Sequence, residues 1–220
     1  LMSSHAPDAG PQTPGPILGP ITLGQAATDV LTTADATEKA RRSQRHAEAW
    51  RAGQLDWAFD APPPARPARP AQPELLPPNR MPKRGKAGSE AARLALLHAL
   101  AHIELNAIDL AWDLLARFGA EMPRGFADDW VRVADEEALH FLLLEKRLHD
   151  LGSCYGALPA HDGLWEAAQV TAHDVVARLA VVPQVLEARG LDVTPQTIER
   201  LERAEDPESA AILARIYRDE

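Results

Sequence analysis

A glutamate and a histidine, Glu137 and His140, stand three positions apart in a segment with the apolar spacing of a helix. At about 100° per residue, the apolar residues of positions 126–148 gather on one side of this helix, and Glu137 falls among them. His140 lies beside Glu137, because side chains at i and i+3 are neighbours on a helix. Glu136 points away from the stripe and is expected in solvent. A carboxylate that faces a core is costly unless something compensates it, so we predict a metal ion here.

Three further glutamates fall on or near the apolar stripes of other predicted helices. Glu104 is centred on its stripe, and the alanines near it leave space that a bulky core would fill. Glu220 is in line with the apolar residues of the last helix, whereas Glu187 lies at the border of the apolar face of the third helix. The residues within about 60° of Glu104 on the helical wheel are Leu97, Leu100, Ala101, Ala107, Ile108, Ala111 and Leu115.

These acids match the ligand pattern of a carboxylate-bridged dimetal site. Such a site takes one Glu from each of two helices and a Glu-x-x-His from each of the other two. Carboxylate oxygens with imidazole suit iron or manganese. We therefore predict two Fe (or Mn) ions, and the second histidine of the pattern is expected three positions after Glu220, where this chain has no residue. The predicted metal ligands are Glu104, Glu137, His140, Glu187 and Glu220.

Four helical patterns after Gly88 would position these side chains. The first runs over residues 89–118 and ends at Gly119, and the second runs from Pro123 to just before Gly152. The third spans about 163–190, and the fourth region has a short helix at about 195–204 and a last helix from 207. No stretch alternates as a strand would. The sequence predicts an all-α, ferritin-like four-helix bundle with a crossover connection at residues 152–162.

The residues before the bundle differ in composition. We expect residues 1–32 to be disordered, residues 33–88 to form a short helix plus a Pro-rich arm, and residues 89–220 to form the bundle. The helix, at about 33–52, has Asp35 or Thr33 as its cap and a basic face that is expected in solvent. Residues 61–84 contain nine prolines. They predict extended chain, either a linker or a strap over the surface.

Charge and cysteine content narrow the functional class. Residues 1–88 carry 11 Lys and Arg against 8 Asp and Glu, whereas residues 89–220 carry 12 against 24. An acidic folded part is the opposite of what nucleic-acid binders show. The lone Cys154 excludes an internal disulfide. Without a signal peptide pattern or an apolar run near the roughly 18 residues that span a membrane, we expect a cytoplasmic protein.

The sequence resembles a bacterial ferritin-like family known as domain of unknown function 455. The resemblance rests on residues 97–108, 135–141, 158–165 and 185–195, and the Pro-rich arm fits it. A more distant resemblance is to the tRNA isopentenyladenosine hydroxylase, a di-iron monooxygenase whose third helix also carries Glu-Ala-Arg, as at Glu187-Ala188-Arg189. These resemblances imply a ferritin-like fold and a di-iron site that includes Glu187. The family pattern continues past Glu220 with a histidine, which implies a fragment or a truncated homologue with an impaired second metal position.

The leading hypothesis is a di-iron oxidoreductase or hydroxylase that uses dioxygen, with Glu137 bridging the metals and His140 on one of them. Its substrate is expected to be a small molecule or an RNA base. The acidic bundle argues against RNA, because phosphate contacts need Lys and Arg and only the arm supplies them. Two alternatives stay open: an iron-binding ferroxidase that stores iron in a shell-forming oligomer, and a metal-free helical adaptor derived from a truncated enzyme. The electron donor is unknown.

Other candidate residues have simpler explanations. His98 and His102 are four apart on one helix, a spacing that can bind metal, but a capping or supporting role fits better. Cys154 has no charged neighbour in sequence and is expected to be inert. The tryptophans expected in the core or at helix contacts are Trp112, Trp130 and Trp165.

Overall fold

Helices make up the regular structure of the chain. A computed structural model describes residues 19, 22–60, 62–82, 88–161, 163–180 and 193–219. Within these residues, strand pairing is limited to two isolated bridges, Thr22 with Asp56 and Leu75 with Ala160. The all-α prediction is confirmed. The helices are α1 (Leu23–Thr32), α2 (Ala36–Arg51), η1 (Pro78–Arg80), α3 (Glu90–Phe118), η2 (Gly119–Glu121), α4 (Arg124–Asp150), α5 (Gly163–Val170), α7 (Pro195–Arg203) and α8 (Pro207–Asp219); residues 175–180 are helical too.

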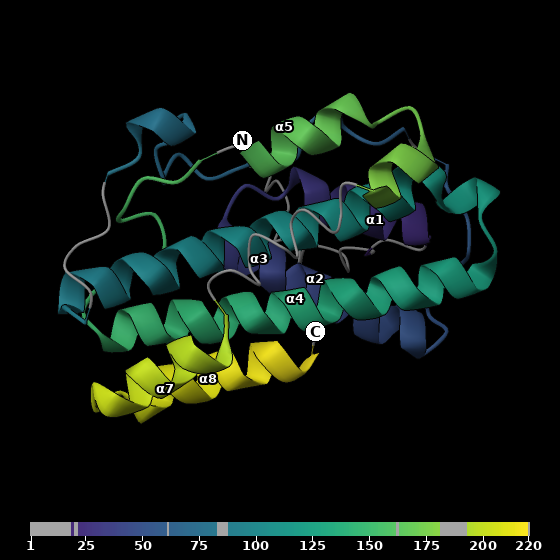
Figure 1. The fold of residues 1–220 in the computed structure, drawn as a ribbon. Coiled ribbons are helices and arrows are strands. Elements are labelled where there is room, and N and C mark those ends of the chain that lie inside the picture. Colours follow the sequence, from purple (N-terminus) through teal and green to yellow (C-terminus); the bar gives the residue numbers. More distant parts are fainter. Residues whose placement is uncertain are drawn as a thin grey trace, which may run out of the picture.

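Helices α3 and α4 form the centre of the molecule, side by side and antiparallel (Figure 1). Helix α5 lies along α3 at one edge, and the α7–α8 pair lies along α4 at the other. Helices α1 and α2 cover the back of the central pair, α1 against α3 and α2 against α4. The main apolar core therefore draws on α1 and α2 as well as on the helices after residue 88.

Helix α3 is the innermost element. Every residue from 100 to 116 is buried, so α3 is enclosed on all sides rather than on one face. Its ends are as expected: the Ser89 hydroxyl accepts a hydrogen bond from the Ala92 N–H, and Gly119 follows the last turn. By length and composition, residues 90–121 are apolar enough to cross a membrane, but 78% of the apolar window is buried inside the fold. Its apolar character is accounted for by this central position.

Helix α4 is amphipathic, as its sequence period predicts. It runs from Arg124 to Asp150, close to the expected bounds. Its apolar stripe packs into the core through Val131, Phe141 and Leu144. Glu136 stays partly exposed, with 35% of its side chain in solvent. Glu137 is only 4% exposed, so the two adjacent acids face opposite environments, as expected.

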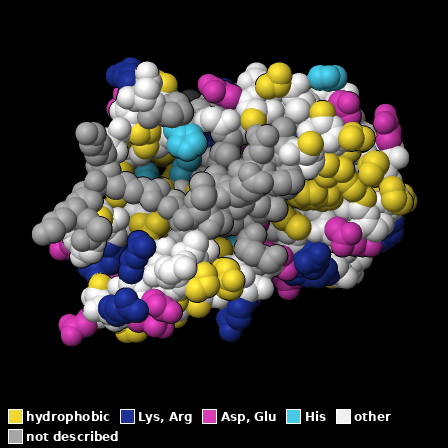
Figure 2. All heavy atoms as spheres, viewed as in Figure 1, with side chains coloured by type: hydrophobic (Ala, Val, Ile, Leu, Met, Phe, Trp, Pro, Cys, Tyr) yellow, Lys and Arg dark blue, Asp and Glu magenta, His cyan; other side chains and the backbone are white. Residues whose placement is uncertain are grey.

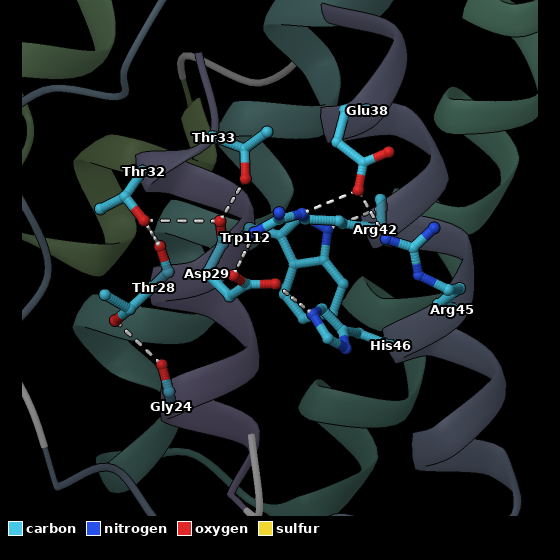
Figure 3. A network of polar contacts seen from close by, with 11 residues as sticks. Gly24, Thr28, Asp29, Thr32, Thr33, Glu38, Arg42, Arg45, His46 and Trp112 are labelled. Carbon is cyan, nitrogen blue, oxygen red and sulfur yellow. Dashed lines mark hydrogen bonds and ion pairs between the residues drawn. The ribbon is translucent and has the colours of Figure 1, made fainter. Parts of the chain in front are cut away.

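Two predictions for the N-terminal part are wrong. Residues 23–32 are not disordered but form α1, whose cap Thr22 accepts a hydrogen bond from the Gln25 N–H. The basic face of α2 is not wholly in solvent either: Arg41 and Arg45 are exposed, but Lys39 is completely buried. Arg42 pairs with Asp29 of α1 at 2.5 Å, and the same carboxylate contacts His46 at 2.7 Å (Figure 3). Lys39 can be buried because its ammonium pairs with the Asp109 carboxylate of α3 at 2.6 Å.

The Pro-rich segment, residues 62–82, is a strap rather than a linker; we refer to it as the strap. The Ala68 N–H donates to the Leu31 carbonyl at 2.8 Å, and the Lys39 ammonium donates to the Ala68 carbonyl at 2.7 Å. Further along, the Leu76 N–H donates to the Ala160 carbonyl at 2.7 Å. These bonds fix the strap to α1, α2 and the connection between α4 and α5.

The third predicted helix is interrupted. Helix α5 ends at Val170, and residues 175–180 start a new helical stretch. The Asp174 carboxylate accepts hydrogen bonds from the Val176 and Ala177 N–H groups at 2.8 and 3.3 Å. This is the geometry of an N-cap, which competes with a continuous helix. One continuous helix over 163–190 is therefore wrong, and residues 181–190 lie outside the described residues.

Candidate metal centre

Helices α3 and α4 bring three of the predicted ligands together. Glu104 comes from α3, and Glu137 and His140 come from α4. One ligand atom of each lies within 4.8 Å of the others. The His140 Nδ1 atom is 3.6 Å from Glu137 Oε2 and 3.9 Å from Glu104 Oε2. All three side chains are buried, with at most 4% of any residue exposed.

The imidazole of His140 has a defined orientation. Its Nε2 atom lies 2.9 Å from the Asp219 Oδ2 atom of α8. A carboxylate accepts but does not donate, so Nε2 carries the hydrogen and donates it. In the neutral ring, Nδ1 then keeps its lone pair, and this atom faces the two glutamates. A histidine that binds a metal is usually oriented by such a carboxylate on its other nitrogen.

Asp219 was missed by the sequence analysis, which selected its neighbour Glu220. Burial raises the pKa of Asp219, but hydrogen bonds from His140 and Arg215 outweigh it, and the net pKa is lowered. Asp219 therefore stays ionised beside the ring. The available signal was its spacing, because Asp219 follows the buried Ile216 by three positions and so shares its side of α8.

The donor set fits a metal ion. Two carboxylates and an imidazole nitrogen supply hard oxygen ligands and one nitrogen ligand, a combination that suits iron or manganese. Placing two carboxylates in a buried site is expensive in free energy, and a divalent cation would offset that cost. The remaining predicted ligands, Glu187 and Glu220, lie outside the described residues.

The position of Glu104 depends on a row of polar residues on the opposite side of α3, which we call the polar stripe. Its members lie between about 140° and 220° around the helix from Glu104 and are His102, Asn106, Asp109, Asp113 and Arg117. All but Arg117, which is partly exposed, are buried. Their spacing of three or four residues keeps them on one side of the helix.

The polar stripe binds four other segments of the chain: α2, the strap, the helical stretch at 175–180 and the loop after α4. Asp109 accepts from Lys39 of α2 at 2.6 Å and from Arg69 of the strap at 2.8 Å. Asp113 pairs with the fully buried Arg178, and so holds the helical stretch at 175–180. Because four segments are tied to it, α3 is fixed both along its axis and in rotation, and Glu104 is fixed with it.

His98 and His102 hold the loop after α4 rather than a metal. His98 Nε2 accepts from the Gly156 N–H at 2.9 Å, and its ring stacks on Tyr155. His102 Nε2 donates to the His161 carbonyl at 2.9 Å, so its Nδ1 accepts from the Tyr155 hydroxyl at 2.9 Å. Burial lowers the pKa of His98 to about 4 and that of His102 to about 3. Both rings are therefore neutral, and their hydrogen bonds go to the loop after α4.

The described chain is thus an all-α protein in which a buried Glu-Glu-His group can hold a metal ion. Residues 32–220 match the model of a family described as protein of unknown function (DUF455). The match covers most of the chain, so this protein belongs to that family. The resemblance seen in the sequence is confirmed; the more distant one, to the hydroxylase, stays a prediction.

A curated relative extends the comparison. The chain is 49% identical over 159 residues to a protein of Haemophilus influenzae that carries the name "Uncharacterized protein". The aligned region is 70% of this chain and 55% of the relative. The chain therefore spans about half the length of the relative. No solved structure matches this chain.

Proposed function

We propose that this protein is a ferritin-like dimetal protein that binds two iron (or manganese) ions and oxidises a small molecule with dioxygen. The observation that carries the proposal is the convergence of three buried donors from α3 and α4, one of them a histidine oriented by Asp219. The bound metals would supply the redox chemistry with dioxygen. The chain would supply geometry and a dry environment.

Each residue has a separate task in this proposal. Glu104 and Glu137 would hold the metal ions through their carboxylate oxygens. His140 would hold one ion through Nδ1, because Asp219 keeps the hydrogen of the ring on Nε2. Glu187 and Glu220 complete the proposed ligand set. The apolar residues around Glu104, such as Leu100 and Ile108, exclude water from this side of the site.

The class of substrate follows from charge. The residues after 88 have twice as many acids as bases, which favours a small molecule over RNA because RNA binding needs Lys and Arg. We also propose a cytoplasmic location, in which the single cysteine stays reduced.

Metal binding tests the proposal, and the adjacent acids of α4 provide a matched control. Glu137→Gln removes a buried carboxylate, whereas Glu136→Gln removes a partly exposed one from the same helix. We expect about two ions per wild-type chain. Affinity for Mn²⁺ should fall at least about tenfold in Glu137→Gln and remain unchanged in Glu136→Gln. Elemental analysis and anaerobic titration calorimetry measure both quantities.

The outcomes separate the alternatives. A metal-binding chain whose Fe²⁺ form changes its visible absorption when air is admitted supports an oxygen-dependent enzyme. A large shell seen by size-exclusion chromatography would instead support a ferroxidase that stores iron. Wild-type protein without metal affinity, or equal affinities in the two variants, would refute the metal site and favour the adaptor.

A further inference from the structure

A second, smaller apolar cluster lies next to the candidate metal centre. It is formed where α5 packs on α3 and consists of Ile103, Ala107, Leu110, Trp165 and Ala168. Glu104 follows Ile103 directly and precedes Ala107 by three positions, so its side chain leaves α3 beside this cluster. Ile103 and Ala107 each keep 7% exposure, whereas the other residues from 100 to 115 are at most 3% exposed. The cluster is thus adjacent both to Glu104 and to the solvent.

Trp165 has a buried indole N–H without a hydrogen-bond acceptor among the described residues. The residue is only 1% exposed. The two other buried indoles both have partners: Trp50 Nε1 donates to Asp128 at 2.9 Å, and Trp112 Nε1 donates to Ser43 at 2.7 Å. Buried donors are nearly always satisfied in folded proteins, so an exception calls for an acceptor from elsewhere.

A water molecule is a poor candidate for that acceptor. Buried waters are held by two to four polar groups, roughly three on average. The apolar side chains that pack with Trp165 are Ile103, Ala107, Leu110 and Ala168, and these side chains offer a water molecule no further hydrogen bond. A molecule with an apolar body and one acceptor oxygen would match these surroundings better, because it satisfies the donor and loses no hydrogen bonds of its own to apolar neighbours.

We propose that the indole N–H of Trp165 binds the acceptor oxygen of an apolar small molecule, such as a ketone or ether, beside the metal centre. The role of this molecule as the substrate rests on the proposed function. Its binding does not, because the N–H and the apolar cluster are present without metal. Trp165 is then the residue that selects which apolar molecules are held next to Glu104.

Two probes of nearly the same shape test this inference on the full, metal-free chain. Cyclohexanone carries one acceptor oxygen, and methylenecyclohexane replaces that oxygen with a CH₂ group. In ¹H–¹⁵N spectra, the Trp165 indole signal, assigned with Trp165→Phe, should move downfield with the ketone and not with the alkene. The ketone should bind about two- to tenfold more tightly, the factor expected for one hydrogen bond. The indole signals of Trp50 and Trp112, which have fixed acceptors, serve as internal controls.

Trp165→Phe provides a second readout, because the phenyl ring keeps the apolar contact and removes the donor. The preference for the ketone should fall to about onefold in this variant. Equal binding of the two probes to the wild type, or no binding of either, would overturn the inference, as would a preference that survives in Trp165→Phe. Because metal titration is a separate measurement, a failure of the metal proposal would be seen independently of this result.

Discussion

In the buried ion pair at Asp109, removing the acid should cost much more free energy of unfolding than removing the lysine. One carboxylate serves two cations: Lys39 at 2.6 Å and Arg69 at 2.8 Å. Asp109→Asn would leave the buried Lys39 and the largely buried Arg69 with neutral acceptors alone. Lys39→Met would leave the carboxylate still paired with Arg69. We therefore expect the two substitutions to differ greatly in free energy of unfolding, although both break the same ion pair.

The expected magnitudes follow from burial. The side chains of Lys39 and Asp109 are both 0% exposed. Removing one partner of a buried pair and stranding the other typically costs about 3–5 kcal/mol, which we assign to Asp109→Asn. Lys39→Met loses a charged hydrogen bond of about 1.5–3 kcal/mol but also removes the desolvation cost of a buried ammonium. Because that burial lowers the pKa of Lys39, the two terms offset, and we expect a change below about 1.5 kcal/mol.

Urea denaturation followed by circular dichroism measures the difference. The double variant Lys39→Met/Asp109→Asn should be more stable than Asp109→Asn alone, because one stranded cation is gone. Asp150→Asn is the control: its pair with Lys146 has nearly the same separation, 2.7 Å, but is exposed, and exposed pairs contribute less than about 1 kcal/mol. Equal costs for Lys39→Met and Asp109→Asn, or strictly additive costs in the double variant, would refute the reasoning.

Three further predictions address other contacts. Burial lowers the pKa of His98 in the folded protein to about 4, from its ordinary 6.5. The free energy of unfolding should therefore decrease as pH falls from about 6.5 to 4, by at most about 3 kcal/mol. In His98→Gln, which keeps an acceptor for the Gly156 N–H, the free energy of unfolding should depend less on pH. Gly24→Ala would place Cβ 2.9 Å from Phe59 Cα and should lower stability by about 1–3 kcal/mol. In the control Gly125→Ala, the new Cβ meets nothing within 4 Å, so this variant should be neutral or more stable by up to about 1 kcal/mol. Thermal denaturation measures both changes. Asp219→Ala should weaken Mn²⁺ binding about 10- to 100-fold by calorimetry, with its melting temperature nearly unchanged; a large loss of stability with full metal affinity would contradict the orienting role.

The parts of the site that could be predicted are those set by helical period. The caps at Ser89 and Gly119 gave α3 its bounds, and the three-residue spacing of Glu137 and His140 placed them on one side of α4. Their convergence with Glu104 followed from the position of each on a core-facing stripe. These features depend on residues within a few turns of one another, which a sequence shows directly.

The parts that could not be predicted depend on partners far away in the chain. Lysine side chains are usually exposed to solvent, and Lys39 can be buried because Asp109, 70 positions later in the chain, pairs with it. Helix α1 is short and is stabilised by packing on α3, so its sequence alone resembled a disordered arm. The break before Asp174 could have been found locally, because an aspartate within a helical pattern is a candidate cap.

The polar stripe also has a consequence for the order in which the protein acquires its form on the ribosome. Lys39 and Arg69 are synthesised before Asp109, so this acid emerges into a chain that already holds its counterions. Arg178 follows Asp113 by 65 positions, and until it emerges the only described cation available to that acid is the neighbouring Arg117. We expect the nascent chain to form the contacts of Asp109 early and the contact of Asp113 with Arg178 only after α5 has been translated.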